Sequence, residues 1–258
     1  MPSPFLDATE IQRSSLAAGW HRAEVLTTTG STNADLVARA EEGAEAGAVL
    51  VAAHQSRGRG RMDRDWEAPP DTSLACSVLV APEREPADWG WLPLVVGLAV
   101  VDGLATSAGL QAGLKWPNDV LVGDRKICGI LCKAVSSPSG PMGVLGFGIN
   151  VSMSAEQLPV ATATSVRLAG SDATATAVVT GVLERLAERY RAWDAGQDVA
   201  RDYRERCLSL GQEVEVQLSE ESFVGTAVDI DAHGGLVVEA GGERRTVVAG
   251  DVLHLRGA

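Results

Sequence analysis

Two short stretches of the chain carry residues whose types and spacing could do chemistry. Gln55–Arg61 alternates glycine with arginine, so its backbone can pass close to a ligand while its side chains present fixed forks of donors to phosphate or carboxylate. Lys115–Asp119 combines a cation, a rigid proline turn and two oxygen-bearing side chains. Together these stretches predict an enzyme that handles a carboxylate and a nucleotide.

Each stretch also has a plainer interpretation. An arginine-rich loop is often only solvated surface, and Asn118 with Asp119 could form an ordinary turn. Alternatively, the loop is a lid that orders over a ligand and excludes water, with Trp66 stacking to close it. Asn118 and Asp119 would then orient a magnesium ion bound to phosphate oxygens, because that ion needs few protein ligands.

Two further positions also allow both a functional and a plain structural interpretation. Lys126 begins an otherwise apolar strand and either points into a site or extends to solvent at its edge. Gly30–Asn33 either offers backbone N–H groups to an anion at a helix start or is a simple N-cap, with Thr32 and Asp35 spaced as a capping box. Standard phosphate-binding motifs are absent from the sequence, so a nucleotide must be held by another architecture.

Composition limits the class of protein. The chain has 258 residues, 45% of them hydrophobic, which suits one main globular domain with a small appendage. With 34 acidic and 22 basic residues its net charge is −12, which argues against broad binding to nucleic acid or anionic membranes. Four cysteines without a paired spacing predict reduced core residues and a cytoplasmic protein, and no zinc site.

The elements that must position these residues favour an α+β fold, a mixed or antiparallel sheet with helices on one face. Strands are expected at Val25–Thr28, Val49–Ala53, Leu74–Val80, Lys115–Trp116, Val120–Val122, Lys126–Val135 and Gly143–Val151, and helices at Ala34–Glu42, Asp88–Ser107 and Ala173–Trp193. Leu92–Ala105 is too short for a membrane helix and is expected to be buried. After Leu210, short alternating strands and glycine turns predict a small antiparallel barrel, giving domains 1–207 and 208–258.

A set of motifs, in this order and spacing, resembles the biotin–protein ligase family. The resemblance covers the chain from Val25 onward and rests on Gly30-Ser31-Thr32-Asn33, Gln55 with Gly58-Arg59-Gly60-Arg61 and Trp66, Lys115-Trp116-Pro117-Asn118-Asp119, Arg125-Lys126 with Gly129-Ile130-Leu131, and Gly148-Ile149-Asn150. It implies a class II synthetase-like catalytic domain and an SH3-like C-terminal barrel. It also implies a reaction in which biotin's carboxylate attacks the α-phosphate of ATP and a lysine of a biotin carboxyl carrier domain then takes the acyl group.

The resemblance also implies roles for individual residues. The biotin site would comprise Ser31, Thr32, Asn33, Gln55, Gly58, Arg59, Arg61 and Lys126. ATP and the adenylate would be bound by Arg61, Arg64, Trp66, Lys115, Asn118 and Asn150, with Asn118 supporting Mg²⁺ and Asn150 contacting adenine. Arg61 and Lys126 would stabilise the transition state, and Asp119 is a candidate to receive the acceptor lysine's proton.

Three departures from the family pattern put loop geometry and affinity in question. Asp63 replaces a glycine of the loop, where an aspartate tolerates positive φ better than most residues, and its charge lies beside Arg61 and Arg64. Arg57 stands where a small residue is usual, and Lys133 replaces an acidic residue.

Three alternatives remain open at this point: a lipoate or octanoate ligase or transferase, a non-catalytic biotin-binding module, and a ligand-sensing repressor. Only about 25 residues precede the first family strand, too few for a helix-turn-helix domain. We therefore expect a monofunctional enzyme that binds neither nucleic acid nor membrane, as a monomer or weak homodimer.

Overall fold

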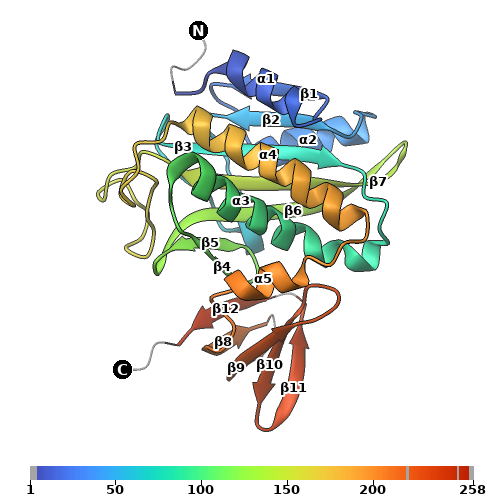
Figure 1. The fold of residues 1–258 in the computed structure, drawn as a ribbon, viewed down its shortest axis with the longest axis vertical. Helices are drawn as coiled ribbons and strands as arrows, with labels where there is room; N and C mark the ends of the chain where they lie inside the picture. The colour runs from blue at the N-terminus through green and yellow to red at the C-terminus, as the bar shows by residue number, and fades with distance from the viewer. Residues whose placement is uncertain (1–4, 219–220, 249, 256–258) are drawn as a thin grey trace.

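The computed structural model describes residues 5–218, 221–248 and 250–255 and is built around a seven-stranded mixed sheet (Figure 1). Across the sheet, the strands are β1 (Arg22–Leu26), β2 (Ala48–Ala52), β3 (Ser73–Val80), β7 (Gly140–Asn150), β6 (Arg125–Ser137), β5 (Asp119–Val122) and β4 (Gly113–Lys115). The first two strands are parallel and all other neighbours are antiparallel. The predicted mixed α+β sheet is confirmed.

Three helices cover one face of the sheet: α1 (Ala8–Ala17), α3 (Leu92–Ala108) and α4 (Ala175–Asp194) (Figure 1). Alternate strand residues point to opposite faces, and Val49 and Val51 of β2 join this large core. Leu50, between them, instead packs with α2 (Thr32–Glu41) in a smaller core on the other face. Helices therefore cover both faces, whereas the sequence led us to expect them on one face only; α2 lies on the face that also carries the cleft described below.

The apolar segment before residue 109 is a core element. A 3₁₀ turn (η2, Pro86–Trp91) precedes α3, so the expected single helix from Asp88 is in fact two elements. Pro86–Ala108 is the one helical stretch of the described residues with the length and hydropathy of a membrane span, and 67% of its most apolar window is buried within the protein. The prediction of a buried helix is confirmed.

Capping residues and hydrophobic spacing in the sequence predicted some helix ends correctly and missed others. Helix α2 begins at Thr32, and its N-cap is Ser31, whose hydroxyl accepts from the Ala34 N–H, so the expected cap by Thr32 was wrong by one residue. Helices α1 and α5 (Ala200–Arg206) were not predicted from the sequence.

The C-terminal residues form a separate antiparallel β-domain, as predicted. Its strand order is β11 (Glu243–Val247), β10 (Leu236–Ala240), β9 (Ser222–Ile230), β8 (Glu213–Gln217) and β12 (Asp251–His254). The glycine turns lie where expected, with positive φ at Gly234, Gly241 and Gly242. The expected boundary after Cys207 falls between α5 and β8 and stays a prediction.

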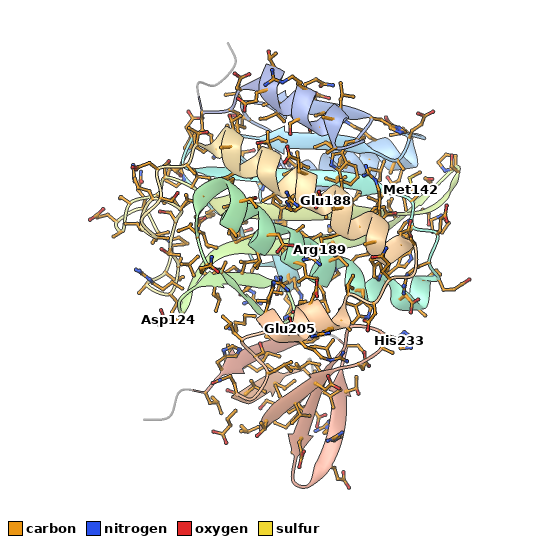
Figure 2. All side chains as sticks on the ribbon, viewed as in Figure 1. Asp124, Met142, Glu188, Arg189, Glu205 and His233 are labelled. Atoms are coloured by element: carbon orange, nitrogen blue, oxygen red, sulfur yellow. The ribbon has the colours of Figure 1, made fainter. Side chains whose placement is uncertain are left out.

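Tryptophans join the β-domain to the rest of the protein. Trp116 is 2% exposed and its indole N–H donates to the carbonyl of Gly234 at 2.9 Å. Trp91 donates likewise to Ala232 at 2.8 Å. His233 lies between Ala232 and Gly234 in the chain, and its ring Nδ1 is 3.1 Å from the Oδ1 atom of Asp88, at the junction of the two domains (Figure 2). The β-domain is thus held against the strands that carry Lys115–Asp119.

The contact between α3 and α4 gives a test of this packing. A Cβ on Gly103 would lie 2.6 Å from Cγ2 of Val182 and 2.7 Å from its Cα, so backbone would have to move. Gly103→Ala should therefore lower the free energy of unfolding by about 1–3 kcal/mol, although alanine is the better helix former. Urea titration measures this, with Ala105→Ser on the exposed side of the same helix as a near-neutral control; a stabilised Gly103→Ala protein would contradict the packing.

Candidate active site

A cleft of about 210 Å³ lies on the α2 face of the sheet, between the glycine–arginine loop and the β-domain. The structure brings into its lining twelve of the fourteen residues proposed from sequence: Ser31, Thr32, Asn33, Gln55, Arg59, Arg61, Arg64, Trp66, Lys115, Asn118, Asp119 and Lys126. These residues come from four separated stretches, so the fold gathers them as the resemblance predicted. Gly58 and Asn150 do not line the cleft.

The floor of the cleft is made of small residues on three adjacent strands: Ala75, Ser77, Gly129, Gly146 and Gly148. A Cβ on Gly146 would lie 2.1 Å from the Asn33 amide oxygen, and one on Gly148 would lie 2.8 Å from the Trp66 ring. The side chains above therefore rest directly on backbone. Gly129 and Gly148 belong to the motifs named above, but none of the five residues was predicted to form the floor of a site. β7 does carry a signal, because small Gly146 and Gly148 alternate with large Leu145 and Phe147.

One end of the cleft is lined by a chain of hydrogen bonds among uncharged side chains. The amide nitrogen of Asn33 donates to the Leu131 carbonyl at 2.8 Å, which leaves its oxygen as an acceptor. The Ser77 hydroxyl lies 2.7 Å from that oxygen and 2.7 Å from the Thr32 hydroxyl. The Ser77 hydroxyl has one proton, and it donates that proton to the Asn33 oxygen, which can only accept. Thr32 then directs its own proton to Ser77 or to the Gln55 carbonyl oxygen 3.2 Å away, and in either case keeps lone pairs for a ligand.

Gln55 is oriented by the same network. Its side-chain oxygen accepts from the backbone N–H of Thr32 at 2.8 Å, so its NH₂ group is the end left to donate. This end of the cleft thus places an acceptor beside a donor. Such a pair is complementary to a ligand with an N–H next to a carbonyl.

Another part of the cleft lining is cationic. The Arg61 guanidinium donates to the Asn118 side-chain oxygen at 3.3 Å and to the Gly250 carbonyl at 3.1 Å. Burial lowers the pKa of Arg61 and of Lys115 from their ordinary values. Half-buried charges are screened less than exposed ones, so these cations attract an anion strongly.

Lys126 is held by an ion pair and by an aromatic ring. Its ammonium lies 2.6 Å from a carboxylate oxygen of Asp119 and 5.7 Å from the centroid of the Trp66 ring. It therefore points into the site, which decides between the two interpretations given from sequence. Asp119, the predicted proton acceptor, is paired with this lysine.

The β-domain contributes to the cleft through Asp251, Val252 and Leu253. Arg64 of the loop donates to both carboxylate oxygens of Asp251, each at 2.6 Å. Nothing in the sequence pattern indicated Asp251, because the pairing joins residues far apart in the chain. The loop also contains the 3₁₀ turn η1 (Arg61–Asp63), where Met62 carries the positive φ of 52° that we expected at Asp63.

Two proposed site residues lie outside the cleft lining. Gly58 is where the loop closes on itself: its carbonyl accepts from the Trp66 N–H at 3.0 Å, and a Cβ there would lie 2.5 Å from the Trp66 carbonyl. Asn150 is 5% exposed and donates to the Thr164 carbonyl at 2.9 Å. Their binding roles stay predictions.

In the part of the chain that the structure describes, the cysteines and acidic residues form no metal-binding cluster. All four cysteines are free, and burial raises the pKa of each thiol, that of Cys132 to about 12. Within residues 5–218, 221–248 and 250–255, no group of three His, Cys, Asp or Glu side chains is arranged to hold a metal ion.

Comparison with known proteins accounts for both parts of the chain. Residues 25–150 match the biotin/lipoate A/B protein ligase family, and residues 209–255 match the biotin protein ligase C-terminal domain. The biotin–[acetyl-CoA-carboxylase] ligase of Mycobacterium tuberculosis is 39% identical, over 98% of this chain and 97% of that protein. The bifunctional ligase/repressor BirA of Bacillus subtilis is 28% identical, over 89% of this chain and 72% of that protein.

The fold agrees with these matches. The biotin protein ligase of Aquifex aeolicus, solved in complex with biotin and ATP, superposes with a TM-score of 0.78 at 27% identity, covering 91% of this chain and 99% of that one. The chain therefore belongs to the biotin/lipoate A/B protein ligase family. Within that family it is similar over nearly its whole length to a biotin ligase, as its motifs predicted.

The hydrogen-bond chain gives a prediction about Ser77. Ser77→Ala should weaken binding of biotin, the ligand that the family resemblance implies, by about tenfold, because Thr32 and Asn33 lose their common partner and a buried acceptor is left unsatisfied. Isothermal titration of biotin measures this. Ser73→Ala, the same truncation four residues earlier on β3, should bind as the wild type does; equal affinity in both variants would show that the network does not orient the site.

The ion pair between Arg64 of the loop and Asp251 of the β-domain gives a second prediction about the site. Both partners contact solvent, so the pair contributes at most about 1 kcal/mol to stability, and Asp251→Asn should leave the melting temperature unchanged. It should instead release the adenylate faster, because Arg64 is no longer held over the cleft. Escape of radiolabelled biotinyl-AMP measures this. The matched control is Glu221→Gln, which removes the exposed Arg245–Glu221 pair of the β-domain outside the cleft lining. Retention equal to wild type in Asp251→Asn would contradict the assignment.

Proposed function

We propose that this protein is an ATP-dependent biotin–protein ligase that works in two steps within one cleft. A carboxylate oxygen of biotin attacks the α-phosphorus of ATP, forming the P–O bond of biotinyl-5′-AMP while pyrophosphate leaves. The uncharged amine of an acceptor lysine then attacks the acyl carbon, forming an amide while AMP leaves and one proton passes to a base. Activation is needed because a carboxylate is a poor acyl donor without a good leaving group.

One observation carries the proposal: a donor–acceptor pair and a cation cluster line the same cleft, whose floor is made of small residues. Thr32 and Gln55 offer an acceptor and a donor to the cyclic urea of biotin. Arg61 and Lys126 line the same cleft and supply the positive charge at which the carboxylate of biotin would meet the α-phosphate of ATP. Bringing two anions together requires such fixed positive charge, which also stabilises the charge that builds on the phosphate.

The remaining predicted roles follow this arrangement. Ser31, Asn33 and Arg59 complete the biotin site, and Arg64, Trp66 and Lys115 contact the nucleotide. Gly58 and Asn150 lie outside the cleft lining, so their roles at biotin and at adenine rest on the family resemblance alone. Asp119 receives the proton of the acceptor lysine. The Lys126–Asp119 pair supports this assignment, since the cation holds the carboxylate in the cleft at 2.6 Å.

The donor set suits a magnesium ion carried by ATP. The Asn118 NH₂ group donates to the Ile130 carbonyl at 3.1 Å, which turns its oxygen toward Arg61 and the cleft. That oxygen is one neutral ligand, and Mg²⁺ bound through phosphates needs few others from the protein. When bound, the ion would neutralise phosphate charge.

The acceptor and the compartment are also part of the proposal. The relative from M. tuberculosis is named for acetyl-CoA carboxylase, which supports a biotin carboxyl carrier domain of a carboxylase as the acceptor here. Four free cysteines suit a reducing compartment such as the cytoplasm.

Lipoate is the alternative substrate within the same family. Its dithiolane ring has no N–H and no carbonyl, so it would leave the donor of Gln55 and the acceptor of Thr32 unpaired on binding. Sites with committed polar groups reject ligands that lack the matching partners. The arrangement therefore favours biotin.

A direct assay tests the function. Incubation with biotin, Mg-ATP and a carrier domain should increase the intact mass of the carrier by one biotinyl group, and excess EDTA should stop the reaction. Lys126→Ala should slow biotin-dependent ATP–pyrophosphate exchange by about 100-fold or more, as loss of a transition-state contact does. Lys133→Ala, another lysine of β6 outside the cleft lining, is the control. Exchange that depends on lipoate would select the alternative, and biotin binding without transfer would reduce the protein to a binding module.

A further inference from the structure

The segment that leads from α5 into the β-domain runs along an edge of the large sheet (Figure 1). β4 is the last strand of that sheet, and one of its sides pairs with β5. On its other side, Cys207 forms an isolated parallel bridge with Leu114, and the Leu208 N–H donates to the Leu114 carbonyl at 2.7 Å. We call residues 207–209 the linker strand. It lies directly against a strand that ends in a residue of the cleft, Lys115.

Ser209 continues this contact through its side chain. The backbone N–H of Trp116, the residue after β4, donates to the Ser209 hydroxyl oxygen at 3.1 Å. The same oxygen lies 2.9 Å from Nε2 of His254, the last residue of β12, and the histidine tautomer sets which of the two donates. Ser209 is 0% exposed, so water does not compete for these bonds. One buried hydroxyl therefore joins the end of β4 to the end of β12.

Both segments that Ser209 joins carry residues of the cleft. Lys115 immediately precedes Trp116 and lines the cleft. β12 begins with Asp251, which also lines the cleft and accepts from Arg64 of the loop. Within its sheet, β12 is the last strand and pairs with β8. The bond through Ser209 thus gives this edge strand a second attachment, directly to the stretch that carries Lys115.

We propose that Ser209 is a positioning residue for the nucleotide site, because it holds Lys115 and Asp251 in place relative to each other. The proposal rests on the proposed function only in taking this cleft as the place where the adenylate forms and is retained. Among the described residues, Ser209 is not part of the cleft lining, so its effect passes through the backbone at Trp116 and through β12. Displacements of about 1 Å caused by a residue outside the chemistry can cost about 100-fold in rate, so this role needs no contact with substrate.

Two substitutions of His254 test the proposal. His254→Leu removes the bond to Ser209, whereas His254→Gln keeps an amide that can donate or accept there. His254→Leu should speed the escape of radiolabelled biotinyl-AMP by about three- to tenfold, as loss of one hydrogen bond does. His254→Gln should restore retention to the wild-type value. The affinity for biotin should stay the same in both, because Thr32 and Gln55 are oriented by other contacts. Wild-type retention in His254→Leu, or equal loss in both variants, would overturn the proposal.

A double-mutant cycle shows whether His254 acts through β12. If His254→Leu works by displacing Asp251, its combination with Asp251→Asn should speed escape by clearly less than the product of the two single effects. Arg204→Gln is the matched control, because it removes hydrogen bonds between α5 and β9 without touching Ser209. Independent effects in the cycle, or equally fast escape in Arg204→Gln, would mean general loosening of the β-domain and would contradict the proposal.

Hydrogen exchange tests Ser209 itself without any substrate. In Ser209→Ala, the Trp116 amide should exchange about tenfold faster, because it loses its acceptor. The Leu208 amide, which donates to a backbone carbonyl, should exchange as in the wild type. Unchanged exchange at Trp116 in folded Ser209→Ala would contradict the proposal. A wild-type protein that forms no biotinyl-AMP would instead contradict the proposed function, and the exchange rates would still decide whether Ser209 holds Trp116.

Discussion

Several half-buried cations share one cleft in a protein whose net charge is −12, and the site depends on keeping them apart and oriented. Each is held by an oxygen on one side: Lys126 by Asp119, Arg64 by Asp251, Arg61 by Asn118 and a backbone carbonyl. Burial already lowers the pKa of Arg61 and Lys115, which shows that their charge is only partly compensated. An anionic ligand supplies the missing charge. The cost of gathering like charges is thus offset when substrates bind, and fixed donors need no reorganisation at the transition state.

The floor of the cleft makes this arrangement sterically possible. Asn33 and Trp66 rest on the backbone of Gly146 and Gly148 with no room for a Cβ. Any larger residue at either position would push a site side chain outward and shorten the cleft. The same strand buries Leu145, Phe147 and Ile149 in the main core, so one strand serves as both core and floor.

The sequence predicts the local parts of the site well and the distant contacts poorly. Motif residues such as Gln55, Arg61 and Lys115 were assigned because each lies in a short stretch whose residue types suggest chemistry, and the fold does bring them together. Asp251 and Ser209 could not be found that way, because they meet the site only through tertiary packing. Helix α1 was missed although its start carries a local signal: Asp7 is the N-cap and accepts from the backbone N–H groups of Thr9 and Glu10. The face of the sheet that α2 covers is set by tertiary packing, which the local pattern does not show. The left-handed residue of the loop was expected where a glycine was missing and falls instead on Met62.

The loop between Gln55 and Trp66 connects regions that would otherwise act separately. Its start pairs through Gln55 with α2, its end packs Trp66 on β6 and β7, and its middle reaches the β-domain through Arg61 and Arg64. Because the β-domain is anchored by Trp116 to the stretch that carries Lys115 and Asn118, the loop closes a ring of contacts around the cleft. Opening the loop breaks exposed contacts at Arg64 but leaves the buried hydrogen-bond chain of Ser77 intact. The contacts around the cleft thus differ in exposure, since those at Ser77 are buried and the Arg64–Asp251 pair contacts solvent. This difference suits the proposed enzyme, which would have to retain an adenylate and then admit a protein lysine.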